Sequence, residues 1–294
     1  MDKDAPQCEL CSSNNVVLLK YYDYFLKDKL KNNIKRVINT LTFSNRYKIV
    51  KQHDVFKAVK IVKCSDCSFA ATYPKVTLED LDTYYSSHQV YAKRDKLDRE
   101  IPGPRPMSNF NYLSEHIPLQ RIDSVIEFGA AGAETSRLIA SKNNLTQIAA
   151  VEPIDNWHKL YNQSKIKINP YYSVFDVKSR YSLLVASHSI EFVADLYANL
   201  KKMIEIIKPG GYLFFEVPNC NATWYKVKRR RVPATYFFST GGIDSLAKKY
   251  NLKIVHVGTF GLNFDEDDDQ IPIQEKYKIN SKGRYLRFVF QTPS

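Results

Sequence analysis

Beyond about residue 100, short apolar runs alternate with segments in which apolar residues recur at helical spacing. Largely apolar runs of this kind are typical of strands in a parallel sheet that is buried on both faces. The runs that predict strands are 124–128, 147–151, 183–187, 212–217, 253–258 and 285–291. Leu196, Leu200, Met203, Ile204 and Ile207 fall on one helical face. The alternation predicts a doubly wound α/β fold.

The first hundred residues differ in texture from the rest. A proline-rich run at 101–106 separates the two parts and is expected to be a linker, because proline fixes the backbone and removes hydrogen-bond donors. The pattern therefore predicts a small N-terminal head over residues 1–100 and a larger α/β domain over 101–294. The acidic run 265–269 is interpreted as a solvated loop.

The composition indicates where the protein is found and what charge its partner carries. The 294 residues are 44% hydrophobic, contain no apolar run near the roughly 20 residues of a membrane span, and begin without a signal peptide's apolar core, so we expect a cytoplasmic protein. The net charge of +12 favours an anionic partner: nucleic acid, a nucleotide-linked small molecule, an acidic glycan or a membrane surface. An excess of lysine that serves only solubility explains the charge equally well.

Four of the five cysteines form two CxxC pairs, Cys8 with Cys11 and Cys64 with Cys67. Two such pairs can present four thiolates to one ion, which predicts a structural zinc site. Disulfides are a competing interpretation, although a cytoplasmic setting disfavours them. A redox-active CxxC is another, but it would require only one pair. Cys220 stands alone and is interpreted as a buried apolar residue.

The apolar run 124–128 leads into a turn that contains Gly129 and Gly132. Such a turn lets the backbone approach a ligand at the carboxyl ends of the strands, where open α/β sheets bind nucleotides. The next strand ends at Glu152, and an acidic residue there can accept hydrogen bonds from both hydroxyls of a ribose. A surface carboxylate at a strand end is the alternative for Glu152.

These segments together resemble the class I S-adenosylmethionine-dependent methyltransferases. The run Glu127-Phe-Gly-Ala-Ala-Gly-Ala133 resembles their first motif and Val151-Glu152-Pro153 their second. The segment 187–193 is similar to the end of their fourth strand, and 200–218, with its Lys-Pro-Gly-Gly turn, to their fifth. The resemblance implies a Rossmann-like seven-stranded sheet whose last two strands form an antiparallel edge. It also implies a set of residues that contact S-adenosylmethionine: Glu127, Gly129, Gly132, Glu152, Pro153, Asp176 and Ser187.

The N-terminal part extends the resemblance. Two CxxC pairs followed by Tyr84, Tyr85 and Tyr91 look like the zinc-binding head of a bacterial subgroup that often methylates sugars, including nucleotide-linked deoxysugars and capsular or lipopolysaccharide precursors. The first motif departs from the family at Ala131 and Ala133, where glycine is common. Because a β-carbon disfavours the left-handed region, we expect negative φ angles at both alanines.

Methyl transfer to an oxygen requires alignment of the acceptor and removal of its proton. His188 follows the fourth strand of the methyltransferase pattern, which predicts that it is the general base; a histidine that only packs is the alternative. The three tyrosines are candidates for a lid over the sugar, although aromatic residues are more often core. Arg229, Arg230 and Arg231 are candidates for binding an acceptor phosphate, or form a solvated basic loop.

Several functions remain open from the sequence alone. The favoured one is methylation of a hydroxyl on a small molecule such as a sugar or sugar nucleotide, with transfer to carbon or nitrogen as variants. An RNA methyltransferase would also use the positive charge, but we find no recognised RNA-binding motif. A binding protein that keeps the fold without turnover would account for the altered glycines. A nicotinamide dehydrogenase fits the later motifs less well.

Overall fold

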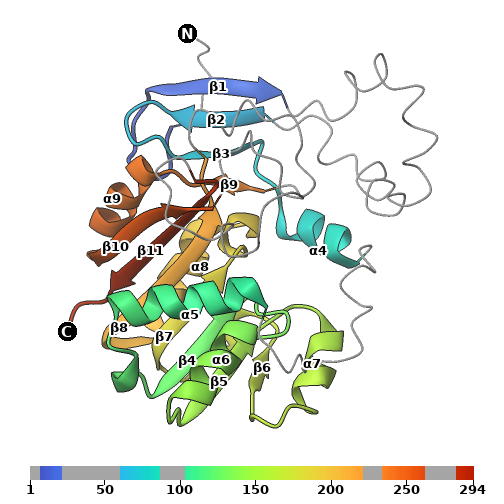
Figure 1. The fold of residues 1–294 in the computed structure, drawn as a ribbon. Coiled ribbons are helices and arrows are strands. Elements are labelled where there is room, and N and C mark those ends of the chain that lie inside the picture. The colour runs from blue at the N-terminus through green and yellow to red at the C-terminus, as the bar shows by residue number, and fades with distance from the viewer. Residues whose placement is uncertain (1–6, 22–59, 87–102, 221–233, 262–282) are drawn as a thin grey trace, which may run out of the picture.

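The computed structural model describes residues 7–21, 60–86, 103–220, 234–261 and 283–294. Its largest element is a seven-stranded sheet (Figure 1). In spatial order the strands are β10 (Lys253–Phe260), β11 (Tyr285–Gln291), β8 (Ile207–Pro218), β7 (Tyr181–Ser187), β4 (Ser124–Phe128), β5 (Gln147–Val151) and β6 (Asn169–Tyr171). The strands from β8 to β6 are parallel, whereas β11 and β10 run antiparallel, so the predicted methyltransferase sheet and its antiparallel edge are confirmed.

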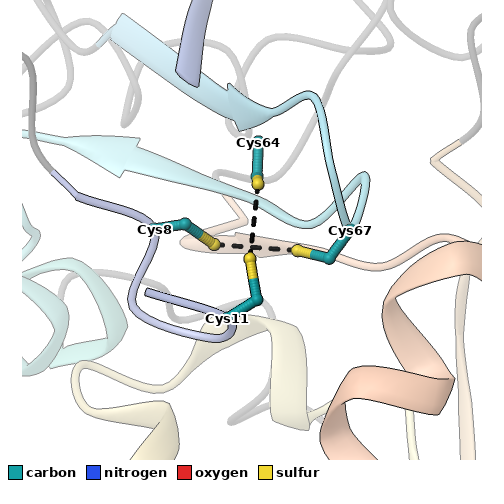
Figure 2. A group of neighbouring side chains, drawn as sticks. All are labelled: Cys8, Cys11, Cys64 and Cys67. Atoms are coloured by element: carbon teal, nitrogen blue, oxygen red, sulfur yellow. Dashed lines mark hydrogen bonds between the residues drawn. The ribbon is translucent and has the colours of Figure 1, made fainter. Parts of the chain in front are cut away.

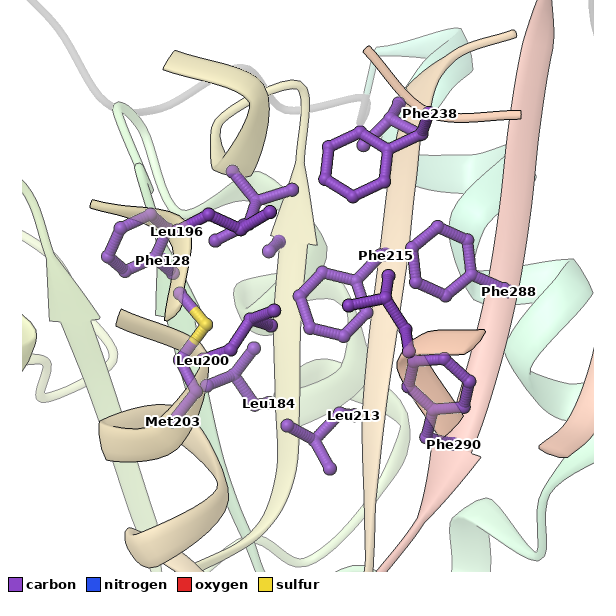
Figure 3. Close-up of a cluster of buried hydrophobic side chains, with 14 of the residues drawn as sticks. Phe128, Leu184, Leu196, Leu200, Met203, Leu213, Phe215, Phe238, Phe288 and Phe290 are labelled. Carbon is purple, nitrogen blue, oxygen red and sulfur yellow. The ribbon is translucent and has the colours of Figure 1, made fainter. Parts of the chain in front are cut away.

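Helices cover both faces of this sheet because successive side chains of each strand point to opposite sides. On one face, Phe214 of β8 packs with residues of α5 (Pro104–His116), α6 (Glu134–Lys142) and α7 (Asp155–Tyr161). On the other face, Phe215 packs with α8 (Leu196–Glu205) and α9 (Thr240–Lys249). Figure 3 shows this second layer, in which Leu200 and Met203 of α8 face Leu184 and Phe215.

The head forms a second sheet. Its strands are β1 (Val16–Tyr21), β2 (Lys60–Cys64), β3 (Ala70–Tyr73) and β9 (Tyr236–Phe237), in this order and all antiparallel. Helix α4 (Leu78–Ser86) follows β3 along the chain. The last strand comes from the C-terminal part of the chain, and Phe69 shares a hydrophobic cluster with Phe215 of the large sheet. The head is therefore built onto the α/β domain, and the expected boundary near residue 100 lies outside the described residues.

Two details of the sequence interpretation are wrong, and one strand was missed. The proline-rich run is not a linker throughout, because α5 begins at Pro104, where the missing N–H of proline costs no helical hydrogen bond. The helix before the fifth strand of the pattern ends at Glu205, and Ile207 begins β8. The short strand β6 was not foreseen, since three residues centred on Pro170 give no periodic signal.

The Lys-Pro-Gly-Gly segment lies within β8 as an irregularity. Tyr181 pairs with Ile207 but Leu183 already pairs with Tyr212, so residues 208–211 bulge from the ladder. Gly210 has φ +71°, a conformation that glycine adopts without strain. Among the described residues, no helix is both long enough and apolar enough to cross a bilayer.

Candidate active site

The order of the strands in the large sheet reverses between β4 and β7. From β4 the chain proceeds outward through β5 and β6, and then returns to place β7 on the other side of β4. Open α/β sheets bind ligands in the crevice at the carboxyl ends of the strands at such a reversal. The loop that starts at Gly129 follows β4, and the segment from His188 follows β7, so the two candidate segments lie at the same point.

Gly129 is required where these two segments meet. Its φ is +62°, and a β-carbon built on it would lie 2.3 Å from the β-carbon of Ser189. The hydroxyl of Ser189 donates to the carbonyl of Phe128 at 2.8 Å, which holds the segments together. The glycine of the first motif is therefore needed both for its backbone conformation and for the close approach of the β7 segment.

The expectation of negative φ at the two alanines is wrong. Ala131 has φ +43° and Ala133 has φ +48°, and Ala133 is the residue that precedes α6. The left-handed region costs an L-residue about 1 to 2 kcal/mol, so the loop keeps a glycine-like path despite its β-carbons. Contacts from outside the loop must offset this cost.

Glu152 supplies one of those contacts. The residue is buried at the end of β5, where one carboxylate oxygen accepts from the N–H of Ala131 at 2.8 Å and the other from the N–H of Ile154 at 3.1 Å. Burial raises the pKa of Glu152, although these two backbone bonds oppose the shift. An ionised carboxylate offers about four lone-pair sites, so each oxygen keeps capacity for a ligand hydroxyl. Pro153, which follows, is exposed.

Glu127 is also buried but faces a helix terminus. Its carboxylate accepts from the backbone N–H of Ser136 at 2.8 Å and so satisfies a donor in the first turn of α6. Burial raises its pKa to about 7. At Gly132, a β-carbon would lie 3.4 Å from the Cγ of Glu134, an ordinary contact, so this glycine is not required by packing.

Asp176 and Ser187 lie on the two sides of this region. Asp176 is exposed at the end of a 3-10 turn, and its carboxylate accepts from the N–H of Ser173 at 3.0 Å in a capping box. The hydroxyl of Ser187, the last residue of β7, donates to Glu216 at 3.2 Å.

His188 directly follows β7 and has φ +53°, a backbone conformation that is uncommon outside glycine and is enriched for histidine. Its backbone N–H donates to the carbonyl of Glu216 at 2.7 Å. Its Nδ1 lies 3.3 Å from a carboxylate oxygen of Glu191 and its Nε2 lies 3.2 Å from one of Glu216. Burial disfavours the imidazolium, but the two carboxylates outweigh burial and raise the pKa of His188.

A buried ion network surrounds this imidazole. Glu216 has no exposed surface, and Arg287 of β11 donates to it through Nε at 2.6 Å. Arg105 of α5 lies 3.2 Å from its other oxygen. Burial alone would raise the pKa of Glu216, but Arg287, with help from His188 and Arg105, holds it well below its usual range.

None of the three charged residues around the imidazole, Glu216, Arg287 and Arg105, was a candidate site residue from the sequence. Glu216 and Arg287 are lone charges inside the apolar runs 212–217 and 285–291, a pattern that costs free energy unless the charges pair. This signal could have found both of them. Arg105 carries no comparable signal, because its place depends on how α5 packs.

The four cysteines of the two CxxC pairs converge in the head (Figure 2). The sulfurs of Cys8 and Cys67 are 3.7 Å apart and those of Cys11 and Cys64 are 3.5 Å apart, and all four lie within 4.8 Å of one another. A tetrahedral zinc site with Zn–S bonds of about 2.3 Å has sulfurs about 3.8 Å apart, so the cluster fits zinc. A disulfide would need about 2.05 Å, and all four cysteines are free.

The two CxxC turns have the same backbone form. The residue after each pair is left-handed, with φ +59° at Ser12 and φ +61° at Ser68. Asp66 of the second turn accepts from Ser13 at 2.5 Å and from Asn15 at 2.9 Å near the first, which joins the turns from outside the cluster. The cysteines are thus held in place by bonds that do not depend on an ion.

The candidates for acceptor contacts cannot be placed. Tyr84 and Tyr85 belong to α4, but their side chains lie outside the described residues. Tyr91, Arg229, Arg230 and Arg231 also lie outside them.

Comparison with known families agrees with the fold. A family described as a methyltransferase domain matches residues 85–257, more than half of the chain. The chain belongs to this methyltransferase family. The match spans the Gly129 loop, Glu152 and the segment after β7.

One solved structure supports the fold. One chain of a complex between the Haloferax volcanii Trm112 methyltransferase activator and a methyltransferase has 11% identity and a TM-score of 0.51, covering 65% of this chain and 91% of its own. The N-methyltransferase NodS of Bradyrhizobium japonicum, in complex with S-adenosyl-L-homocysteine, has 14% identity and a TM-score of 0.49, covering 71% and 98%. No curated protein matches the sequence.

We predict that the purified methyltransferase carries about one zinc ion per chain. Replacing Cys64 with serine should remove the ion and destabilise the head, because metal binding contributes directly to the folding of such modules. Elemental analysis and thermal unfolding measure both effects. Cys220→Ser is the matched control, because Cys220 is a buried cysteine outside the cluster, and this variant should keep its zinc. A zinc-free parent protein after metal-replete expression would contradict the prediction.

Proposed function

We propose that the protein transfers a methyl group from S-adenosylmethionine to a hydroxyl of a sugar in a nucleotide-linked, capsular or lipopolysaccharide precursor. Family membership and the sheet support methyl transfer, and the resemblance of the motifs to class I enzymes supports the donor. The sugar acceptor is supported by the resemblance of the zinc head to sugar methyltransferases and by the polar cluster after β7 and β8.

That cluster is the observation that carries the proposal. Glu191 lies in the 3-10 turn η4 (Ile190–Phe192) after β7 and is 1% exposed, and its carboxylate lies 3.3 Å from Nδ1 of His188. The Nε2 of His188 lies 3.2 Å from Glu216, so buried carboxylates face both nitrogens of the ring. Buried polar groups are almost always hydrogen-bonded, so this polar cluster at the carboxyl ends of β7 and β8 favours a ligand rich in hydroxyls.

The cofactor would be held by the neighbouring loop. The backbone after Gly129 would approach the methionine end, and Glu152 has the lone pairs for the ribose hydroxyls. Bound S-adenosylmethionine supplies an electrophilic methyl group on a sulfonium sulfur.

His188 would take the proton that the acceptor hydroxyl loses. Its Nδ1 lies 3.3 Å from Glu191 and its Nε2 lies 3.2 Å from Glu216. As the ring gains a proton, Glu191 stabilises the positive charge and fixes the orientation of the imidazole. Arg105 and Arg287 balance Glu216 on the other side of the ring.

Contacts farther along the acceptor are assigned to residues outside the described part of the chain. Tyr84, Tyr85 and Tyr91 would close over the sugar, since aromatic rings pack on its apolar face. Arg229, Arg230 and Arg231 would bind a phosphate or diphosphate of the precursor, because guanidinium groups form paired hydrogen bonds to phosphate oxygens.

The acceptor class is testable directly. With labelled S-adenosylmethionine, we expect methyl transfer to nucleotide-linked sugars, with the label on a sugar oxygen by mass spectrometry. Unmodified nucleotides serve as controls and should accept none. Transfer to RNA alone, with an affinity that falls steeply with salt, would overturn the sugar assignment in favour of an RNA methyltransferase.

Replacing Glu152 with alanine should weaken S-adenosylmethionine binding by about 1.5 to 3 kcal/mol, because the ribose hydroxyls and the Ala131 N–H lose a charged acceptor. Calorimetry measures the change. Asp176→Ala is a matched removal of a carboxylate. Weaker S-adenosylmethionine binding in this variant would indicate a cofactor contact at Asp176, and unchanged binding would leave it only its capping role. Unchanged affinity in a folded Glu152→Ala protein would place the ribose elsewhere.

Replacing His188 with alanine should lower turnover by about 100-fold or more, with cofactor affinity largely kept, because the hydroxyl then has no base. His256→Gln is the control, since His256 lies on β10 and stacks on His116 of α5, away from the ends of β7 and β8. Turnover of His188→Ala within about threefold of the parent would exclude the base.

The pH profile gives an independent test. The groups that face the His188 ring are Glu191, Glu216, Arg105 and the ring of Tyr285. Because the carboxylates raise the pKa of His188 above its ordinary 6.5, the neutral base form should be reached only above that pH. Turnover should therefore fall as pH drops through this raised pKa. Glu191→Gln should move this acidic limb to lower pH.

A further inference from the structure

The backbone of Ala131 is held from two sides. Its N–H donates to Glu152 at 2.8 Å, and its carbonyl accepts from the phenol of Tyr161 at 2.5 Å. The peptide is thus clamped between the end of β5 and the end of α7, while its own φ is +43°. A left-handed alanine persists only where its surroundings fix it.

Tyr161 is well placed for this task. It is the last residue of α7 and is 2% exposed, within the cluster that also contains Trp157, whose ring lies beside Gly132 of the same loop. Burial, followed by the nearby Glu152 and Glu127 carboxylates, raises the pKa of Tyr161. The phenol therefore keeps its proton and acts as a donor to the carbonyl.

We propose that Tyr161 is a positioning residue for the cofactor loop. It acts through the backbone of Ala131. By fixing this peptide, it holds Ala131 in the left-handed conformation that glycine adopts without strain, and it keeps the Ala131 N–H directed at Glu152. The hydroxyl is the essential part, because the ring of phenylalanine would fill the same space without the donor. The proposal rests on the proposed function in that the loop binds S-adenosylmethionine.

The first test is Tyr161→Phe. Loss of one buried hydrogen bond is expected to weaken binding of S-adenosylhomocysteine by about three- to tenfold in calorimetry. The KM for S-adenosylmethionine should rise by a similar factor while kcat stays near that of the parent. A merely structural tyrosine would lower thermal stability without this split.

Tyr236→Phe is the matched control. Tyr236 is buried, and its phenol donates to the carbonyl of Ala194 at 3.0 Å and accepts from the N–H of Leu196 at 3.3 Å, so a bond from a buried phenol to a carbonyl is again lost, away from the cofactor loop. We expect a comparable loss of thermal stability and unchanged affinity for S-adenosylhomocysteine. Equal loss of affinity in both variants would overturn the proposal.

The second test is rescue by glycine. Because glycine adopts positive φ without strain, Ala131→Gly in the Tyr161→Phe background should recover most of the lost affinity. Ala130→Gly in the same background is the control, since Ala130 is not among the left-handed residues and should give no recovery. A double variant with Ala131→Gly that binds as weakly as Tyr161→Phe alone would contradict the strain argument.

A third measurement needs no ligand. Amide hydrogen exchange of residues 129–133 should be at least several-fold faster in Tyr161→Phe than in the ligand-free parent, because the clamp opens more often. If the parent failed to bind S-adenosylhomocysteine, the proposed function would fall, and exchange would still decide whether Tyr161 holds the loop. Unchanged exchange in a folded variant would overturn the inference.

Discussion

The ion pair between Glu216 and Arg287 is the interaction on which the rest of the structure depends. The two residues lie opposite each other in the ladder between β8 and β11, and both are almost wholly buried. Leaving either charge without its partner would cost several kcal/mol, so the pair fixes the register of the antiparallel edge. A slip of one residue would turn Arg287 to the other face of the sheet. The same guanidinium donates to Ser108, which ties α5 to this edge.

From this pair the active site follows by contact. Glu216 meets Ser187 and His188 at the end of β7, and its backbone carbonyl accepts the His188 N–H. Glu216, which pairs with the buried Arg287, is therefore also the residue that holds the candidate base His188. When carboxylates face both nitrogens of an imidazole, they set its pKa. Replacing Glu191 is therefore expected to change turnover by changing the pKa of His188, although Glu191 is not among the proposed contacts of the methyl donor.

The sequence predicted the elements whose signal is local. The bounds of β4, β5 and β11 agree with the apolar runs 124–128, 147–151 and 285–291, because strands inside the sheet that are buried on both faces are largely apolar. The convergence of the four cysteines was likewise predictable from their spacing. The left-handed alanines were not; at Ala131 the backbone is held by Glu152 and Tyr161, which are distant in sequence. Nor was β9, whose two residues pair with β3 across the chain.

The pairing of β9 with β3 joins the cysteine cluster to the segment that follows β7. Thr235 lies just before β9. Its carbonyl accepts from the N–H of Thr72 of β3 at 2.9 Å, and the N–H of Thr235 donates to the carbonyl of Glu191 at 2.8 Å. On the other side of the cluster, Ser239 donates to the carbonyl of Ser68, next to Cys67. The turn that carries Glu191 is therefore supported by the same short strand that supports the head. Because the Glu191 side chain in turn faces His188, the candidate base is supported from the side of the head, whereas the loop after Gly129 is supported by α7 on the opposite face of the sheet.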